Sequence, residues 1–338
     1  MRPRQTPVRT MTGLVLALCG VMVSACGGPS GVKATYAASG GSDDRLSNLT
    51  EMDQRVARVA QRLLTANADL CPVVRESAGW SLHSANQYRE QLRRAAVERF
   101  GLYGDLPGIL AAPDDSPAAQ AGLRQGDLIL SVNDIELEAG DTRTKPRFEG
   151  LATNTQVLDR ALSSGPTRLR IRRSGREIPA TVIPRRSCGY DVQLNPSDEL
   201  NARADGRRLY ISTALTAFAA NDDELAIILG HELAHHVLRH RAWDETGGAG
   251  RTVTEASTNV IARDDPERQA DRVGMFLAAR AGFDTAVAES FWRRFGASNW
   301  RVRYPQLGHD SAGARALAVA RVEVEIEALR RRGAPLVY

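Results

Sequence analysis

The residues His231-Glu232-Leu233-Ala234-His235 decide the fold and most of the chemistry of this chain. The two histidines are four positions apart, so on a helix they project from one face, about one turn from each other. Two neutral imidazoles at that spacing can hold one zinc ion and leave room for a third protein ligand and a water. Glu232 can reach that water as a general base. The alternative is a helix whose histidines are only polar surface groups.

The sequence before this stretch predicts that it is helical. Polar residues at 221–223 offer N-caps, and Leu225, Ile228 and Leu229 form an apolar stripe with helical spacing. We therefore expect the histidines to stand on a helix that is buried on one side.

A second helix is predicted about thirty residues further on. Asp265 is a suitable N-cap and Pro266 suits the first helical position. Glu267 and Asp271 then share one face, so that one of them can ligate zinc and the other can accept a ring N–H from a ligating histidine. The alternative is an acidic first turn that only complements the helix dipole.

Taken together, these motifs carry a resemblance to a known family. Residues 231–235, followed by Glu267-x-x-Ala-Asp271-x-x-Gly274, resemble the membrane-associated metallopeptidases that include HtpX, the CAAX prenyl proteases and the periplasmic outer-membrane-assembly proteases. The segment 201–206, ahead of a strand at 208–212, is similar to the lead-in to the catalytic helix of that family. The resemblance covers roughly residues 188–316.

The resemblance implies a fold and a set of roles. The fold class is α+β, with a mainly helical, zincin-like (gluzincin) peptidase domain. His231, His235 and Glu267 bind one Zn²⁺ per chain, Glu232 is the base, and Asp271 orients a ligand. The strand near Tyr210 is expected to be the sheet edge that pairs with the substrate backbone.

The N-terminal segment predicts export. Residues 1–25 read as a signal peptide, with arginines, an apolar run too short to span a membrane comfortably, and then small residues. The ending resembles a bacterial lipobox with Cys26 as the lipidated residue, and the alternative is an ordinary signal peptide that is cut nearby. Residues 26–45 would be a flexible tether. With Gly27 after the cysteine, the expected location is the periplasmic side of the outer membrane, anchored by lipid; the alternative is a soluble periplasmic or secreted protein.

The segment 99–186 has a different character. Its residues 116–134 closely resemble the core of a bacterial PDZ domain, a β-rich module that adds a peptide strand to a sheet edge. Residues 155–163 would line the peptide groove, and the carboxylate-binding loop would fall at Phe100-Gly101-Leu102. The expected partners are peptide C-termini or internal strands. The alternative is a small structural spacer.

Two further cysteines flank this segment. Cys71 lies in a helical lead-in at 46–98, and Cys188 opens the catalytic domain at 187–338. A pair of cysteines in an oxidising periplasm is expected to be joined. We therefore predict a Cys71–Cys188 bridge at the base of a PDZ-like domain that is inserted into the peptidase domain.

Composition excludes little else. The formal net charge is +4, but Arg2, Arg4 and Arg9 supply three of these charges, so the remainder gives no indication of nucleic-acid binding.

Residues 243–259 are polar and glycine-rich, either a mobile lid or a plain loop. Helices are expected at 276–295 and 312–332.

His309 is a candidate for a role at the metal. Family members similarly carry a His-Pro pair that is followed by an arginine. His309 and Arg315 fit that pattern, whereas Asp310 replaces the proline. The hypothesis is that His309 faces the metal, supporting the oxyanion or capping the zinc, and that Arg315 helps to position it. The alternative is a solvated loop histidine.

These observations predict a lipid-anchored zinc endopeptidase of the bacterial envelope that acts on misfolded or envelope proteins in protein quality control. The main alternative is a periplasmic chaperone or scaffold that retains the zinc fold and binds client peptides through the PDZ-like domain. A peptide-binding adaptor with a vestigial peptidase domain is a third possibility. The intact Glu232 argues against it.

Overall fold

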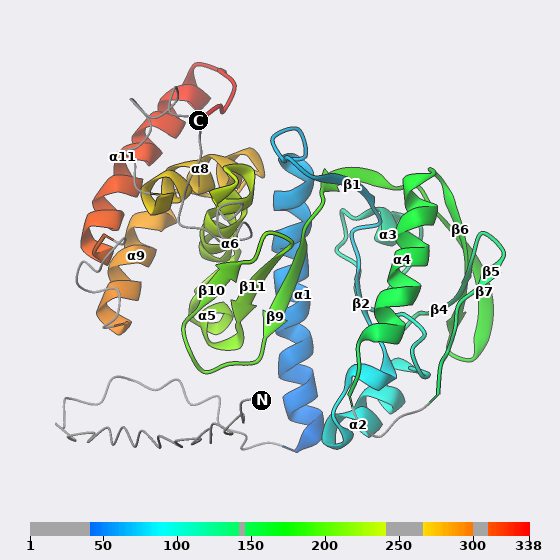
Figure 1. The fold of residues 1–338 in the computed structure, drawn as a ribbon. Coiled ribbons are helices and arrows are strands. Elements are labelled where there is room, and N and C mark those ends of the chain that lie inside the picture. The colour runs from blue at the N-terminus through cyan, green and yellow to red at the C-terminus, as the bar shows by residue number, and fades with distance from the viewer. Residues whose placement is uncertain (1–40, 142–145, 241–265, 300–309) are drawn as a thin grey trace, which may run out of the picture. The chain divides into compact units, whose positions relative to one another are not determined.

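The computed structural model describes residues 41–141, 146–240, 266–299 and 310–338, which form a mixed helix and strand structure (Figure 1). The expectations for Cys26, for His309 and for the segment 243–259 lie outside these residues. In the part of the chain that the structure describes, no helix has the length and apolar character needed to cross a membrane.

A six-stranded, antiparallel sheet is built from residues 81–182. Its order is β2 (Ser81–His83), β3 (Gly108–Ala111), β4 (Leu128–Val132), β6 (Thr167–Arg173) and β7 (Arg176–Val182), with β5 (Ile135–Glu136) paired to β4. Helix α4 (Glu149–Ser163) packs Leu158 and Leu162 into the same apolar core as Ile129 and Leu169. The short helix α3 (Pro117–Gln120) is capped by the Ser116 hydroxyl, which accepts from the Ala119 N–H.

This sheet begins earlier in the chain than the sequence suggested. Strand β2 precedes residue 99, so the segment expected to be a helical lead-in supplies a strand to the PDZ-like sheet. Residues 84–100 of that lead-in are also not one helix. The Gln87 side chain accepts a hydrogen bond from the Ser84 N–H at 3.1 Å across the 3-10 turn η1 (Ala85–Gln87), and helix α2 (Glu90–Phe100) starts only after an extended Arg89.

The expected carboxylate loop at Phe100-Gly101-Leu102 is wrong for this structure. Phe100 and Leu102 are buried core residues. Gly101 ends α2 in the left-handed conformation, and its N–H donates to the Val97 carbonyl. These residues end a helix and fill a core, so the Gly101 amide is already used and does not face a ligand.

A second sheet has three strands in the order β10 (Ala202–Ala204), β11 (Arg208–Ser212), β9 (Asp191–Asn195). Strand β11, which carries Tyr210, is therefore central, and the expectation that it is an edge is wrong. Asp205 accepts hydrogen bonds from the Arg207 and Arg208 N–H groups, and this turn folds β10 back along one side of β11. Strand β9 pairs in parallel with the other side.

Beyond β11, the described residues are mostly helical. Their elements are α5 (Thr213–Phe218), α6 (Asp222–Val237), α8 (Pro266–Arg280), α9 (Val287–Ser298) and α11 (Ala312–Arg331). A shared core includes Phe276, Phe291 and Ile326, all fully buried. The helix expected over 276–295 is two helices, because Gly282 adopts a positive φ of 76° and turns the chain between α8 and α9.

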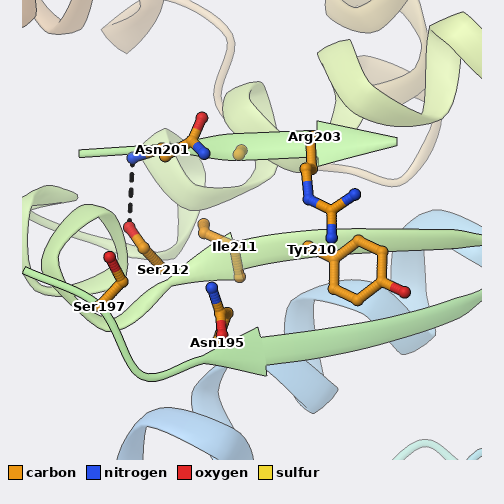
Figure 2. A pocket seen from close by; sticks show the side chains of 8 residues that line it. Asn195, Ser197, Asn201, Arg203, Tyr210, Ile211 and Ser212 are labelled. Atoms are coloured by element: carbon orange, nitrogen blue, oxygen red, sulfur yellow. Dashed lines mark hydrogen bonds between the residues drawn. The ribbon is translucent and has the colours of Figure 1, made fainter. Parts of the chain in front are cut away.

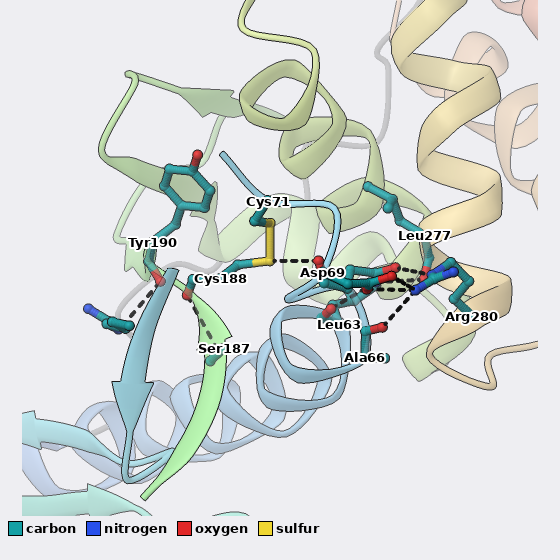
Figure 3. The surroundings of a disulfide bond; sticks show 11 residues. Leu63, Ala66, Asp69, Cys71, Ser187, Cys188, Tyr190, Leu277 and Arg280 are labelled. Carbon is teal, nitrogen blue, oxygen red and sulfur yellow. Dashed lines mark hydrogen bonds and ion pairs between the residues drawn. A yellow bond between two sulfur atoms is a disulfide. The ribbon is translucent and has the colours of Figure 1, made fainter. Parts of the chain in front are cut away.

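Helix α1 (Ser42–Ala66) contributes to the cores of both parts, with Leu46 in the sheet core and Leu63 in the helical core. Beyond it, β1 (Val74–Ser77) pairs antiparallel with β8 (Arg185–Cys188). Strand β1 precedes the six-stranded sheet and β8 follows it, so the two connections to that sheet lie side by side. A disulfide joins Cys71 to Cys188 beside this pair (Figure 3), with their Cα atoms 5.5 Å apart.

The end of α1 is also tied to α8. The Arg280 guanidinium binds the Asp69 carboxylate, and the Asn67 amide donates to the Leu277 carbonyl (Figure 3). Asn67 is fully buried, so this contact fixes α8 relative to α1.

Candidate metal centre

Helix α6 presents the His-Glu-Leu-Ala-His stretch. It starts where the sequence predicts, because the Asn221 side chain accepts a hydrogen bond from the Glu224 N–H at 2.9 Å and caps the first turn. The Glu224 carboxylate is buried and is bound by Arg294 from α9. The N-terminal end of α6 is thus held at two points, which places its last two turns against α8.

Two glycines set the distance between α6 and α8. A Cβ on Gly230 would lie 2.7 Å from the Gly274 carbonyl oxygen, and a Cβ on Gly274 would lie 2.7 Å from the His231 nitrogen. Every atom in these close contacts belongs to the backbone, so the two helices touch without intervening side chains. Ordinary helix pairs are separated by 8–10 Å through their side chains. The glycine crossing brings residues at the start of α8 within reach of His231.

Three ligand atoms converge beside this crossing. His231 Nε2 lies 3.2 Å from His235 Nε2. Glu267 Oε2 lies 3.3 Å from His231 Nε2, and Glu267 Oε1 lies 3.5 Å from His235 Nε2. All three side chains are largely buried, with exposed fractions of 12%, 12% and 19%.

These separations fit a tetrahedral zinc ion. Zinc–nitrogen and zinc–oxygen bonds of roughly 2.0–2.1 Å at tetrahedral angles place neighbouring ligand atoms about 3.3 Å apart. The two imidazole nitrogens are close to that separation, and each of them is close to it from one of the two Glu267 oxygens. One ligand atom from each of the three residues lies within 4.8 Å of the others, and no other group of His, Cys, Asp or Glu within the described ranges has comparable metal-binding geometry. The donor set of two imidazoles and one carboxylate also suits zinc.

Asp271 lies behind His231, on the side away from the ligand atoms. Its Oδ1 is 3.0 Å from His231 Nδ1. Arg315 from α11 binds the same carboxylate through Nε and Nη2, and its guanidinium carbon lies 3.6 Å from the centre of the Trp292 ring. Asp271 and Arg315 are both buried. The structure therefore brings together His231, His235, Glu267, Asp271 and Arg315 of the expected site residues. It places Arg315 on Asp271 and, through Nη2, 3.2 Å from His231 Nδ1.

The charges around the site favour a cation. Burial acts to raise the pKa of Glu267, but the hydrogen bond from His231 and the charges of His231, His235 and Arg315 outweigh it and lower that pKa to about 2. Burial likewise acts to raise the pKa of Asp271, yet Arg315 holds it below its ordinary value. Burial acts to lower the pKa of His231, whereas its hydrogen bonds to Asp271 and Glu267 raise it to about 9. A metal that binds through His231 Nε2 competes with a proton for that nitrogen.

Glu232 follows His231 on α6 and is buried. Its charge is among those that raise the pKa of Arg315, the residue that holds Asp271. Glu232 is therefore a buried carboxylate one position after a residue of the ligand cluster, with little access to solvent.

His309 cannot be placed, because it lies outside the described residues. The next residue, Asp310, is within the described ranges. Its two carboxylate oxygens accept hydrogen bonds from Arg268 Nε and Nη2, at 2.6 and 2.9 Å. Arg268 directly follows Glu267, so residue 310 is held next to the first turn of α8. The role of His309 stays a prediction.

Sequence reasoning missed His240. Its Nδ1 lies 3.0 Å from His235 Nδ1, and its Nε2 lies 3.2 Å from the Gln269 side-chain oxygen. His240 is five positions beyond His235, a spacing that does not share a helix face, so helical periodicity gave no signal. The run of histidines at 231, 235, 236 and 240 was the only sign in the sequence.

A small polar hollow lies over the three-stranded sheet (Figure 2). It is lined by Asn195, Ser197, Asn201, Arg203, Tyr210 and Ser212 among others. The Ser212 hydroxyl accepts from the Asn201 N–H at 3.2 Å, and the Arg203 guanidinium stacks on the Tyr210 ring. The hollow lacks the size and apolar lining of a substrate cleft.

Two family models match parts of the chain. Peptidase family M48 matches residues 170–261, which include His231, Glu232 and His235. The PDZ domain matches residues 108–145, which include β3, β4 and β5. Glu267 and Asp271 lie beyond the matched peptidase segment.

A curated relative and a solved structure are also similar to parts of the chain. The mitochondrial metalloendopeptidase OMA1 of Saccharomyces cerevisiae is 29% identical over 107 residues, which are 26% of this chain and 31% of that relative. The chain thus spans about a third of the length of this relative. The crystal structure of the HtrA3 PDZ domain bound to a phage-derived ligand covers 34% of this chain and 92% of its own, with 17% identity and a TM-score of 0.25.

The family matches agree with the site geometry, since the peptidase segment contains the helix on which two of the converging ligands stand. The chain therefore contains a peptidase family M48 domain and a PDZ domain, and these findings support a metalloprotease function.

Proposed function

We propose that this chain is a zinc-dependent endopeptidase of the bacterial envelope, with His231, His235 and Glu267 as the metal ligands and Glu232 as the general base. The observation that carries the proposal is the convergence of His231 Nε2, His235 Nε2 and the Glu267 carboxylate at the α6–α8 crossing, with one ligand atom of each within 4.8 Å of the others. Three protein ligands leave a fourth position for water or substrate, which is the arrangement of catalytic rather than structural zinc sites.

The residues divide the chemistry among them. Zinc bound here would polarise the scissile carbonyl and lower the pKa of a water molecule. Glu232 takes a proton from the attacking water on its carboxylate and later delivers it to the leaving amine. Asp271 accepts the His231 Nδ1–H, which would leave the lone pair of Nε2 available to a metal. Arg315 neutralises Asp271 and so makes its burial possible.

The substrate backbone is proposed to pair with β10 rather than with β11. Strand β10 is an outer strand of its sheet and contacts α6, the helix that carries Glu232. An extended peptide can add to such an edge through main-chain hydrogen bonds. A peptide substrate with N-methylated amides next to the scissile bond should then be cleaved far more slowly than its parent, and equal rates would contradict strand addition.

The PDZ domain is proposed to hold the C-termini or internal strands of protein substrates. Strands β2 and β7 are the two outer strands of its sheet, and each offers an edge to a peptide. Comparison of a peptide that has a free C-terminus with its C-terminal amide distinguishes the two modes. Equal binding indicates internal strands, whereas loss of binding in the amide indicates carboxylate recognition.

A lipid anchor on Cys26 is proposed to hold the enzyme on the periplasmic side of the outer membrane. The support is the lipobox-like ending of the N-terminal segment. Mass spectrometry of the N-terminal peptide of the exported protein tests it, and an unmodified peptide that begins elsewhere would contradict the anchor.

Substitutions of the two acids on α8 test the ligand assignment. Glu267→Gln should weaken zinc binding by more than roughly 100-fold, because a direct ligand is lost. Asp271→Asn should weaken it by roughly 10- to 100-fold, because only the orientation of His231 is affected. Asparagine is preferable to alanine at 271, since Arg315 would otherwise be left as an unpaired buried charge. Competition with a chelating dye measures both affinities. A greater loss for Asp271→Asn than for Glu267→Gln would show that the two roles are reversed.

A further inference from the structure

The two histidines of the metal centre each have a second ring nitrogen that faces away from the ligand atoms. For His231 this nitrogen meets Asp271. For His235 it meets His240, with the two Nδ1 atoms 3.0 Å apart. His240 in turn reaches Gln269 on α8, two positions after Glu267. Each histidine ligand therefore has a partner of its own, and only the partner of His231 was visible in the sequence.

The pattern of hydrogens along this chain of contacts is forced by metal binding. A histidine that binds metal through Nε2 carries its hydrogen on Nδ1. His235 Nδ1–H must then donate to His240 Nδ1, which accepts through its lone pair. A neutral His240 consequently carries its hydrogen on Nε2, and that N–H donates to the Gln269 oxygen at 3.2 Å. Every donor meets an acceptor, and no group needs a charge.

The backbone is bent to place His240 there. Helix α6 ends at Val237 with Leu238 as its C-cap, and Arg239 has a φ of 56°, which a residue with a side chain adopts rarely. This left-handed residue turns the chain, so that His240 comes back beside His235 although it lies beyond the helix. Conformations of this kind persist where the surrounding structure holds them, often at functional sites.

We propose that His240 is a positioning residue, which with Gln269 fixes the tautomer and ring orientation of His235 for metal binding. The inference rests on the proposed function in that a metal must bind His235 Nε2. His240 itself touches neither metal nor substrate. Its role on His235 corresponds to that of Asp271 on His231, but with a neutral acceptor, so that the site gains no further negative charge.

Three variants and a control test the proposal by zinc affinity, measured on purified protein. His240→Leu removes the acceptor and should weaken zinc binding by roughly 10- to 100-fold. His240→Asn places an amide oxygen near the position of Nδ1 and should restore the affinity to within a few fold of the wild type. Gln269→Leu should give an intermediate loss. His236→Leu is the control: His236 stands on the same helix but stacks on Tyr190 and contacts the Arg208 carbonyl. This control should lower the melting temperature of the metal-free protein and leave zinc affinity unchanged.

Two further readouts separate positioning from simple stability. The visible absorption bands of the cobalt-substituted protein should shift in His240→Leu and return in His240→Asn, because they report ligand geometry. The melting temperature of the metal-free protein should stay the same in His240→Leu, while its rise on adding zinc should shrink.

The outcomes are distinct. Wild-type protein that binds no zinc would overturn the proposed function itself. Wild-type zinc binding together with an unchanged affinity and cobalt spectrum in His240→Leu would overturn only the role of His240. A lower metal-free melting temperature with unchanged affinity would reduce His240 to a structural residue, and failure of His240→Asn to restore binding would refute the acceptor role.

Discussion

Replacement of Glu232 by glutamine is expected to abolish peptide hydrolysis while the chain keeps its zinc. An amide is nearly the same size as a carboxylate, so the buried position should be filled as before. It cannot accept the proton of the attacking water, however, and the loss of a general base typically costs roughly 100- to 10,000-fold in rate. Cleavage of a denatured protein, followed together with zinc content by atomic emission, measures both effects.

Asp223→Asn provides a matched control for this prediction. It makes the same chemical change on the same helix, but Asp223 lies in the first turn of α6 and accepts a hydrogen bond from the Asp284 N–H. It should leave both turnover and zinc content close to the wild type. Substantial hydrolysis by Glu232→Gln would show that another group is the base. A wild-type protein that is loaded with zinc yet cleaves nothing would instead favour the chaperone alternative.

The parts of the site that sequence could predict depend on local spacing. His231, Glu232 and His235 lie on one helix, and Glu267 and Asp271 lie one turn apart on another, so helical periodicity was sufficient to propose each set. The start of α8 at Pro266 likewise follows from the conformation that proline imposes. Joining the two sets into one site required the family resemblance, because no local rule states which helices pack together.

Sequence reasoning failed where the answer depended on contacts between distant residues. Strand β11 was expected to be an edge, yet whether a strand is central depends on which neighbours pair with it, and here the turn at Asp205 adds β10 to its open side. Strand β2 has only three residues, too few for an alternating pattern to stand out. His240 reaches His235 through the left-handed Arg239, and nothing in the sequence of that turn marks the conformation.

Helix ends show the same division between local and distant causes. The 3-10 turn at Ala85–Gln87 is a local feature, since the Gln87 side chain accepts from the Ser84 N–H only three residues away. It was nevertheless overlooked, because the lead-in at 46–98 was expected to be helical. By contrast, the pairing of Asp310 with Arg268 joins residues 42 positions apart and could not be inferred from either one.

The glycine crossing is where a single methyl group should have the largest structural effect. Gly274→Ala would place a Cβ 2.7 Å from the His231 nitrogen, 2.8 Å from the His231 Cα and 2.9 Å from the Gly230 carbonyl carbon. Real Cβ atoms do not approach so closely, and none of these backbone atoms can rotate away. Helices α6 and α8 must therefore move apart, carrying Glu267 and Asp271 away from the histidines.

Gly274→Ala is accordingly expected to destabilise the protein by about 1–3 kcal/mol, the usual cost of overpacking. Helix propensity alone predicts the opposite sign, since alanine is favoured over glycine by about 1 kcal/mol inside a helix. Zinc affinity should fall by roughly tenfold or more, as it does when the orientation of a ligand is lost. Chemical denaturation and a zinc titration measure the two effects.

Gly313→Ala is the matched control. Gly313 lies in α11, and a Cβ there would meet no atom within 4 Å. This variant should be neutral or slightly more stable, with unchanged zinc affinity, because only helix propensity acts on it. If Gly274→Ala instead behaved like Gly313→Ala in both measurements, α6 and α8 would have room between them. The close approach of the two backbones would then not be what brings Glu267 to His231 and His235.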